Sequence, residues 1–226
     1  MQKTNKKLLA FVILGVMVFT AVFSGLAVMA FNSSRAAGAD EYFIDLDNVF
    51  IIGDSAGANL ASFVGVLATN ERIRDHYGLE VPVGIRGLGL ACGIYGFLDT
   101  LTGGIQKFIG RLLVSMYFGK PLKKLPDINT YSTFRTMTSD FPPTFVTGCK
   151  DDFIYNESVL MAEKLKELGI NNDVLIYEND KKTLKLEHVF HYRWVYNDGK
   201  PIKEAIEVRE RMINFFDGLL KKGDDV

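Results

Sequence analysis

Short apolar runs alternate with amphipathic stretches along most of this chain. Four runs have the length of buried strands: residues 48–52, 83–91, 144–147 and 173–177. Three other stretches carry apolar residues at helical spacing: residues 58–70, 158–168 and 202–220. Because strands that alternate with helices usually pair in parallel, the pattern predicts an α/β fold with a mainly parallel sheet flanked by helices.

Some of these elements carry finer signals. Gly169 directly follows the helix expected over 158–168 and suits its C-cap. The last helix is expected to have one core-facing stripe made of the apolar residues at positions 202, 206, 213, 216 and 220. Between the second and third strands, residues 97–139 mix aromatic and basic side chains. A helical cap over a pocket and ordinary surface helices explain that segment equally well.

The N-terminal 31 residues differ from the rest. Three lysines within the first seven residues precede 24 uncharged residues, 8–31. A secretory signal has an apolar region of about 7–15 residues, whereas a bilayer-spanning helix needs about 20. The length favours a membrane anchor that leaves the remainder outside the cytoplasm, while Val28-Met29-Ala30 offers small residues for cleavage and secretion. Residues 32–40 are typical of a linker, so the domain is expected over 41–226.

Composition narrows the class of protein. With 226 residues, 48% of them hydrophobic, the chain can bury one sizeable core. Its basic excess is confined to the first 35 residues, and acids outnumber bases in the rest, so no nucleic-acid partner is expected. Cys92 and Cys149 are too few for a disulfide framework and lack a metal-ligand spacing. We therefore interpret both as buried thiols and expect no metal site.

The stretch Gly53-Asp54-Ser55-Ala56-Gly57 fits the pattern G-x-S-x-G between a predicted strand and a predicted helix. A sharp strand-to-helix turn puts the serine in a strained backbone conformation, so its neighbours two before and two after should be small. The following helix N-terminus favours negative charge, and the Ala56 N–H can stabilise a tetrahedral oxyanion. An ordinary serine in a tight turn is the alternative, and only suitable partners decide between the two.

A serine nucleophile in this setting needs an acid and then a histidine later in the chain. Three histidines exist: His76, His188 and His191. His188 follows the fourth strand, where a loop over the strand ends is expected, and His191 is its close alternative. His76 lies in a polar stretch and is expected to be exposed. Asp151 and Asp152 follow the third strand, from which an acid reaches a histidine on the next loop.

Three stretches, GDSAGANLA, FPPTFVTGCKDDFIYNES and EHVFH, resemble the hormone-sensitive-lipase-like carboxylesterases and lipases of the α/β-hydrolase fold. The resemblance covers roughly residues 41–220. It implies that Ser55 is the nucleophile, that His188 is the base and that Asp152 orients the histidine, with Asp151 as the fallback. It also implies hydrolysis of a small-molecule ester or a lipid through an acyl-enzyme, which needs no cofactor.

The sequence departs from that family before Ser55. The family carries an HGGG motif there, whose N–H groups complete the oxyanion hole, but no histidine precedes Ser55 and the pair Gly103-Gly104 comes after it. The family's first strands are also missing, so the elbow strand is expected to have an open, apolar edge that favours self-association. We expect a slow esterase made of the C-terminal part of a hydrolase domain joined to an anchor. An inactive remnant or binding module, or a peptidase on the same fold, is the alternative.

Overall fold

The computed structural model of the protein describes residues 45–81, 83–96, 124, 128–178, 186–192 and 199–221. Apart from residues 124 and 128, they belong to one compact unit formed by 45–100 and 129–226. The predicted anchor, the linker, and residues 97–123 and 125–127 of the predicted cap lie outside the described residues. None of the described helices is long and apolar enough to cross a membrane.

Four parallel strands form the sheet, and their order in space is their order in the sequence. They are β1 (Val49–Asp54), β2 (Ile85–Ala91), β3 (Thr144–Cys149) and β4 (Asn172–Tyr177). All four predicted strands are therefore present, with ends within two residues of the expected ones. The α/β fold with a parallel sheet is confirmed.

Helices fill most of the connections between the strands. The three predicted helices are α2 (Ala56–Thr69), α6 (Tyr155–Glu167) and α7 (Lys203–Asp217). Shorter helical turns that the sequence did not predict are α3 (Glu71–Tyr77) and η3 (Phe190–Tyr192). Two others, η2 (Ile128–Tyr131) and α5 (Thr133–Thr136), lie within residues 97–139, where helices of a cap or of the surface are expected. Gly169 follows α6 with a φ of 68°, as the predicted left-handed C-cap requires.

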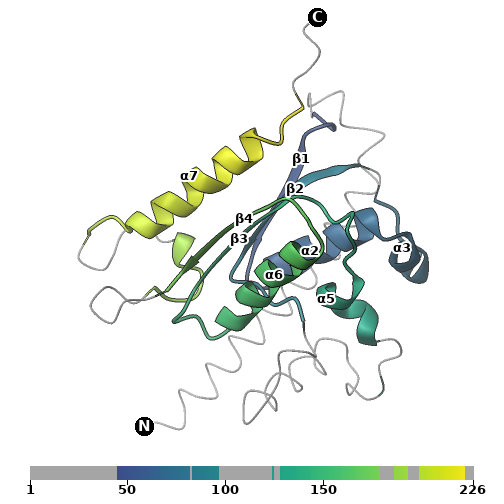
Figure 1. Ribbon diagram of the computed structural model, residues 1–226, viewed down its shortest axis with the longest axis horizontal. Helices are drawn as coiled ribbons and strands as arrows, with labels where there is room; N and C mark the ends of the chain where they lie inside the picture. Colours follow the sequence, from purple (N-terminus) through teal and green to yellow (C-terminus); the bar gives the residue numbers. More distant parts are fainter. Residues whose placement is uncertain are drawn as a thin grey trace, which may run out of the picture. The chain divides into compact units, whose positions relative to one another are not determined.

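The two faces of the sheet pack against different helices (Figure 1). Helices α2 and α6 cover one face, against which Leu88, Leu90 and Val146 are fully buried. Helix α7 covers the other face, where Phe145 is fully buried. Neighbouring residues Phe145 and Val146 of β3 thus point to opposite faces, as the pleat of a strand requires.

Two glycines of β2 let α7 lie close to the sheet. The strand reads IRGLGLA, so its leucines face α2 and its glycines face α7. A Cβ on Gly87 would lie 3.0 Å from Leu219, and one on Gly89 would lie 2.9 Å from the sulfur of Met212. A larger residue at either position would therefore force the side chain of Leu219, which follows α7, or of Met212 within it to move.

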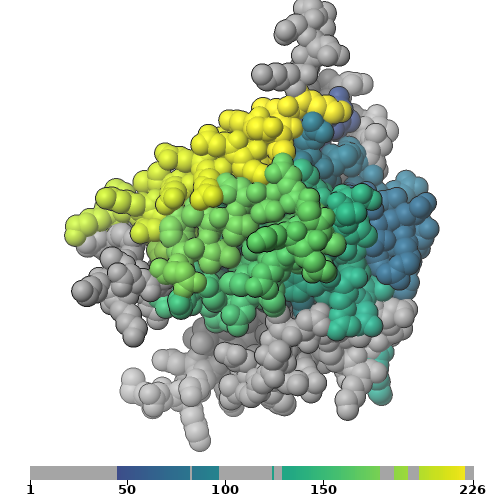
Figure 2. All heavy atoms as spheres, in the orientation of Figure 1, coloured from purple at the N-terminus to yellow at the C-terminus, as the bar shows by residue number. Residues whose placement is uncertain are grey.

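The buried face of α7 differs from the predicted stripe. The buried residues at and within this helix are Ile202, Ala205, Val208 and Met212. Three residues of the predicted stripe are instead exposed: Ile206, Ile213 and Leu220. The prediction was wrong for these three because it followed the larger apolar residues at steps of seven and passed over Ala205 and Val208. Figure 2 shows α7, in yellow, at the surface of the molecule.

Among the described residues, β1 pairs only with β2. Ile52 of β1 is 57% exposed, which is unusual for an isoleucine in a strand of a parallel sheet. The described part of the sheet therefore has the open edge that the sequence leads us to expect. Self-association through that edge stays a prediction.

Replacing Leu88 by alanine should lower the free energy of unfolding by about 2–5 kcal/mol, because Leu88 is fully buried between β2 and α2. The matched change Leu220→Ala, at a side chain that is 45% exposed, should cost less than about 1 kcal/mol. Urea unfolding of both variants checks this. Equal losses in the two variants would contradict the described core.

Candidate active site

Ser55 occupies a strained turn between β1 and α2. Its φ of 51° and ψ of −118° lie where residues other than glycine are rarely found. Its N–H donates to the Ala91 carbonyl at 2.9 Å, which holds the turn against the end of β2. A Cβ on Gly53 would collide with the Gly57 carbonyl, so the turn needs glycine there. A Cβ on Gly57 would meet nothing closer than Asp54 Oδ1 at 3.7 Å, so alanine would fit.

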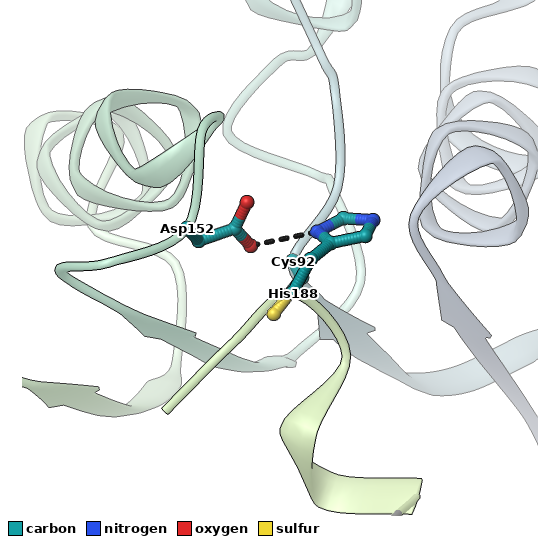
Figure 3. A group of neighbouring side chains, drawn as sticks. All are labelled: Cys92, Asp152 and His188. Atoms are coloured by element: carbon teal, nitrogen blue, oxygen red, sulfur yellow. Dashed lines mark hydrogen bonds and ion pairs between the residues drawn. The ribbon is translucent and has the colours of Figure 1, made fainter. Parts of the chain in front are cut away.

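Ser55, His188 and Asp152 lie in one chain of hydrogen bonds. His188 Nε2 is 2.9 Å from Ser55 Oγ, and His188 Nδ1 is 2.9 Å from Asp152 Oδ2. Figure 3 shows the histidine–aspartate contact as a dashed line. The three residues follow β1, β4 and β3 respectively. Parallel strands end at the same rim of a sheet, and this rim brings together side chains that are distant in sequence.

The Asp152 carboxylate is buried, and both of its oxygens have a donor. Its side chain is 1% exposed, Oδ1 accepts from the Ile154 N–H at 3.0 Å, and Oδ2 contacts His188. Both oxygens of this buried carboxylate thus have a hydrogen-bond partner, and the contact at Nδ1 orients the His188 ring with Nε2 toward Ser55. The fallback acid, Asp151, is exposed.

Cys149 hydrogen-bonds the two residues that precede His188. Its thiol donates to the carbonyls of Leu186 at 3.3 Å and Glu187 at 3.6 Å. Burial, with the nearby Asp152 as the next cause, raises the pKa of this thiol to about 12, so it remains a donor at neutral pH.

On the other side, the Phe153 ring lies 4.8 Å from the His188 ring and is 72% exposed.

Cys92 lies at the same rim, directly after β2. Both cysteines are buried free thiols, as the sequence leads us to expect. Cys92 has a φ of 48°, and the only other described non-glycine residues with positive φ are Ser55 and Val189. All three are at or beside the hydrogen-bonded group, where backbone strain commonly collects in functional sites. Figure 3 shows Cys92 next to Asp152 and His188.

A buried glutamate positions the chain that follows Cys92. Glu157 of α6 is 3% exposed, and its Oε2 accepts from the N–H groups of Tyr95 at 2.8 Å and Gly96 at 3.0 Å. Asn59 of α2 donates to the Ile94 carbonyl at 2.6 Å. The sequence offers no signal for these roles, because the partners are backbone groups that lie far away along the chain.

The other two histidines are outside the hydrogen-bonded group. His76 is exposed on α3, as expected, and its ring stacks edge-on against Tyr77. His191 lies in η3, is 7% exposed, and its Nδ1 has no hydrogen-bond partner among the described residues. Burial lowers the pKa of His191 to about 4, with smaller contributions from His188 and Arg209 in the same direction and from Asp54 against it.

Comparison with known proteins adds a family and a set of related folds. A family profile described as the alpha/beta hydrolase fold matches residues 20–191, about three quarters of the chain. Esterase B from Lactobacillus rhamnosis is 21% identical, with a TM-score of 0.63, over 77% of this chain and 54% of its own. The chain thus spans just over half the length of that esterase.

Two further solved structures share the fold. The carboxylesterase Cest-2923 from Lactobacillus plantarum is 14% identical with a TM-score of 0.63, over 88% of this chain and 68% of its own. A thermostable esterase from Pseudomonas putida is 16% identical with a TM-score of 0.57, over 88% of this chain and 60% of its own. At such low identities the likeness establishes the fold alone.

Buried His191 should make the protein sensitive to mild acid. Its pKa is lowered on folding, so the unfolded chain binds more protons between about pH 6.5 and pH 4, and stability is lost as the pH falls through that window. Between pH 7 and pH 5 the loss from this group is roughly 1.5–2 kcal/mol.

Urea unfolding at both pH values measures this loss. The variant His191→Phe should lack that part of the pH dependence, whatever its absolute stability, and the exposed-site control His76→Phe should retain it. A His191→Phe variant as acid-sensitive as the unchanged protein would contradict the assignment.

Proposed function

This chain belongs to the α/β-hydrolase fold family, and we propose that it hydrolyses carboxylic esters through a Ser55–His188–Asp152 triad. One observation carries the proposal: two contacts of 2.9 Å join the serine hydroxyl, both ring nitrogens of the histidine and a buried carboxylate. Solved structures with the same fold are named as esterases and a carboxylesterase, which supports an ester as the substrate class.

In the proposed reaction, Ser55 Oγ attacks the ester carbonyl carbon while His188 Nε2 takes the hydroxyl proton. Asp152 keeps the other ring proton on Nδ1 and stabilises the imidazolium that forms. The C–O bond to the alcohol then breaks, and the alcohol leaves with the proton from Nε2. Water attacks the acyl-enzyme by the same route, which releases the carboxylic acid and restores Ser55.

Ala56 is the proposed oxyanion donor. It is the first residue of α2, and no side chain caps the start of this helix. N–H groups in the first turn of a helix lack partners within the helix and carry partial positive charge, so they suit a developing oxyanion. The described residues include no second donor of the HGGG type. Loss of one donor costs about 10²–10³ in kcat, so a site with Ala56 as its only donor is proposed to be slow.

The proposed substrate is a small-molecule ester or a lipid. The exposed Phe153 ring beside His188 offers an apolar surface next to the reacting atoms. We also propose attachment to a membrane through residues 1–31, or secretion after cleavage. This proposal depends on the three lysines and the 24 uncharged residues that follow them.

A non-catalytic binding module is the second candidate. The open edge of β1 favours it, because among the described residues the strand that ends at Ser55 is paired on one side only. A nucleophile on such a strand is less firmly held than one in the middle of a sheet. This candidate predicts a folded protein whose Ser55 is inert.

Replacing Asp152 by asparagine should lower kcat for p-nitrophenyl acetate by about 10⁴, because the amide no longer holds the required His188 tautomer. Ser55→Ala should remove turnover altogether. The adjacent change Asp151→Asn is the matched control and should leave kcat within about twofold, because Asp151 is exposed.

Steady-state kinetics on the purified full chain measures these effects. Folded protein without activity above buffer would favour the binding module over the enzyme. Equal losses in Asp151→Asn and Asp152→Asn would overturn the choice of acid.

A further inference from the structure

We propose that Cys92, Asp152 and His188 also bind one thiophilic divalent cation, such as Zn²⁺, and that the bound cation switches hydrolysis off. The switching part of this proposal rests on the proposed function, whereas cation binding does not. Spacing along the sequence gave no hint of such a site, because its three ligands follow three different strands.

The ligand atoms are already close to one another. One atom from each of the three side chains lies within 4.8 Å of the other two, and Figure 3 shows the three residues as one group. Ligands on a tetrahedral zinc ion, with bonds of about 2.0–2.3 Å, lie about 3.3–3.6 Å apart. The side chains therefore need to shift by about an ångström to hold an ion. A water completes the fourth position, as in zinc sites with three protein ligands.

The surrounding structure orients two of the three ligands. The Cys92 N–H donates to the Thr147 carbonyl at 3.0 Å, and the Val189 N–H hydrogen-bonds the cysteine sulfur, which offsets a small part of the rise in the thiol pKa caused by burial and Asp152. The Ile154 N–H donates to Asp152 Oδ1, and this hydrogen bond remains when a cation binds to Oδ2. Such outer contacts fix the direction of metal ligands and strengthen binding.

Thiolate, imidazole and carboxylate together favour zinc or cadmium over magnesium or calcium, which prefer oxygen ligands alone. Cys92 is fully buried, and burial together with Asp152 holds the pKa of its thiol well above the usual range. The cation must therefore displace the thiol proton, which it does by forming the metal–sulfur bond. One proton leaves for solvent for each cation bound, and nothing is oxidised or reduced.

Binding at His188 Nδ1 would reverse the roles of the two ring nitrogens. In the proposed mechanism, Nδ1 carries the proton toward Asp152, and Nε2, which is 2.9 Å from Ser55 Oγ, accepts the serine proton. A cation needs the lone pair of Nδ1, so the ring proton moves to Nε2. His188 can then no longer accept the proton of Ser55. Cation binding and ester hydrolysis therefore exclude each other.

Cadmium titration of the full chain tests the site without reference to activity. The ultraviolet charge-transfer band of a cadmium thiolate should rise to one equivalent in the unchanged protein and in the inert Ser55→Ala variant. It should vanish in Cys92→Ser, with Cys92→Ala as a second variant and circular dichroism as the check on folding. The matched change Cys149→Ser should retain it. No band in the unchanged protein, or an undiminished band in Cys92→Ser, would overturn the site.

Ester hydrolysis in the presence of Zn²⁺ tests the switch. Zinc should inhibit the unchanged protein, a chelator should restore its rate, and Cys92→Ser should need at least tenfold more zinc for half inhibition. A cadmium band without zinc inhibition of an active enzyme would overturn the switch. Absence of hydrolysis in metal-free protein would instead count against the proposed function, so the two failures remain distinct.

Discussion

Parallel backbone pairing of β1 with β2, β2 with β3 and β3 with β4 is the constraint on which the site depends. The ladder pairs Asp54 with Ala91 and Cys149 with Tyr177, so the strands reach the same rim of the sheet. At that rim, each strand ends and a turn or loop begins. Ser55, Asp152 and His188 come from three of these connections. A shift in the register of any one strand would separate the three side chains.

Strain and burial at the rim are balanced by hydrogen bonds. Positive φ at Ser55, Cys92 and Val189 is unfavourable, and a buried carboxylate such as Asp152 is costly without donors. The Ala91 carbonyl, the Ile154 N–H and the imidazole of His188 supply the compensating contacts. Cys92 lies beside the same hydrogen-bonded group, so one compact cluster holds both the proposed triad and the three ligands of the proposed cation site.

The sequence predicted most of the sheet and singled out the three side chains that the structure joins by hydrogen bonds, whose catalytic roles stay a prediction. Strand lengths and the order serine, acid, histidine carry that information, because they depend on local pattern and chain order. The sequence failed where tertiary packing decides. The apolar pattern does not reveal that the small residue Ala205 lies on the buried face of α7. Residue spacing also does not reveal that Glu157 accepts hydrogen bonds from backbone N–H groups far away along the chain. The location of Cys92 depends on where β2 ends relative to its neighbours.

Proton NMR of the His188 ring tests most directly whether His188 and Asp152 meet at the end of the sheet. A ring N–H donated to a buried carboxylate resonates far downfield of the amide region. We expect one such signal, absent from His188→Gln and from Asp152→Asn, and present in His191→Phe. Folded protein that shows no such signal, or a signal that survives in His188→Gln and disappears in His191→Phe, would contradict the convergence of His188 and Asp152.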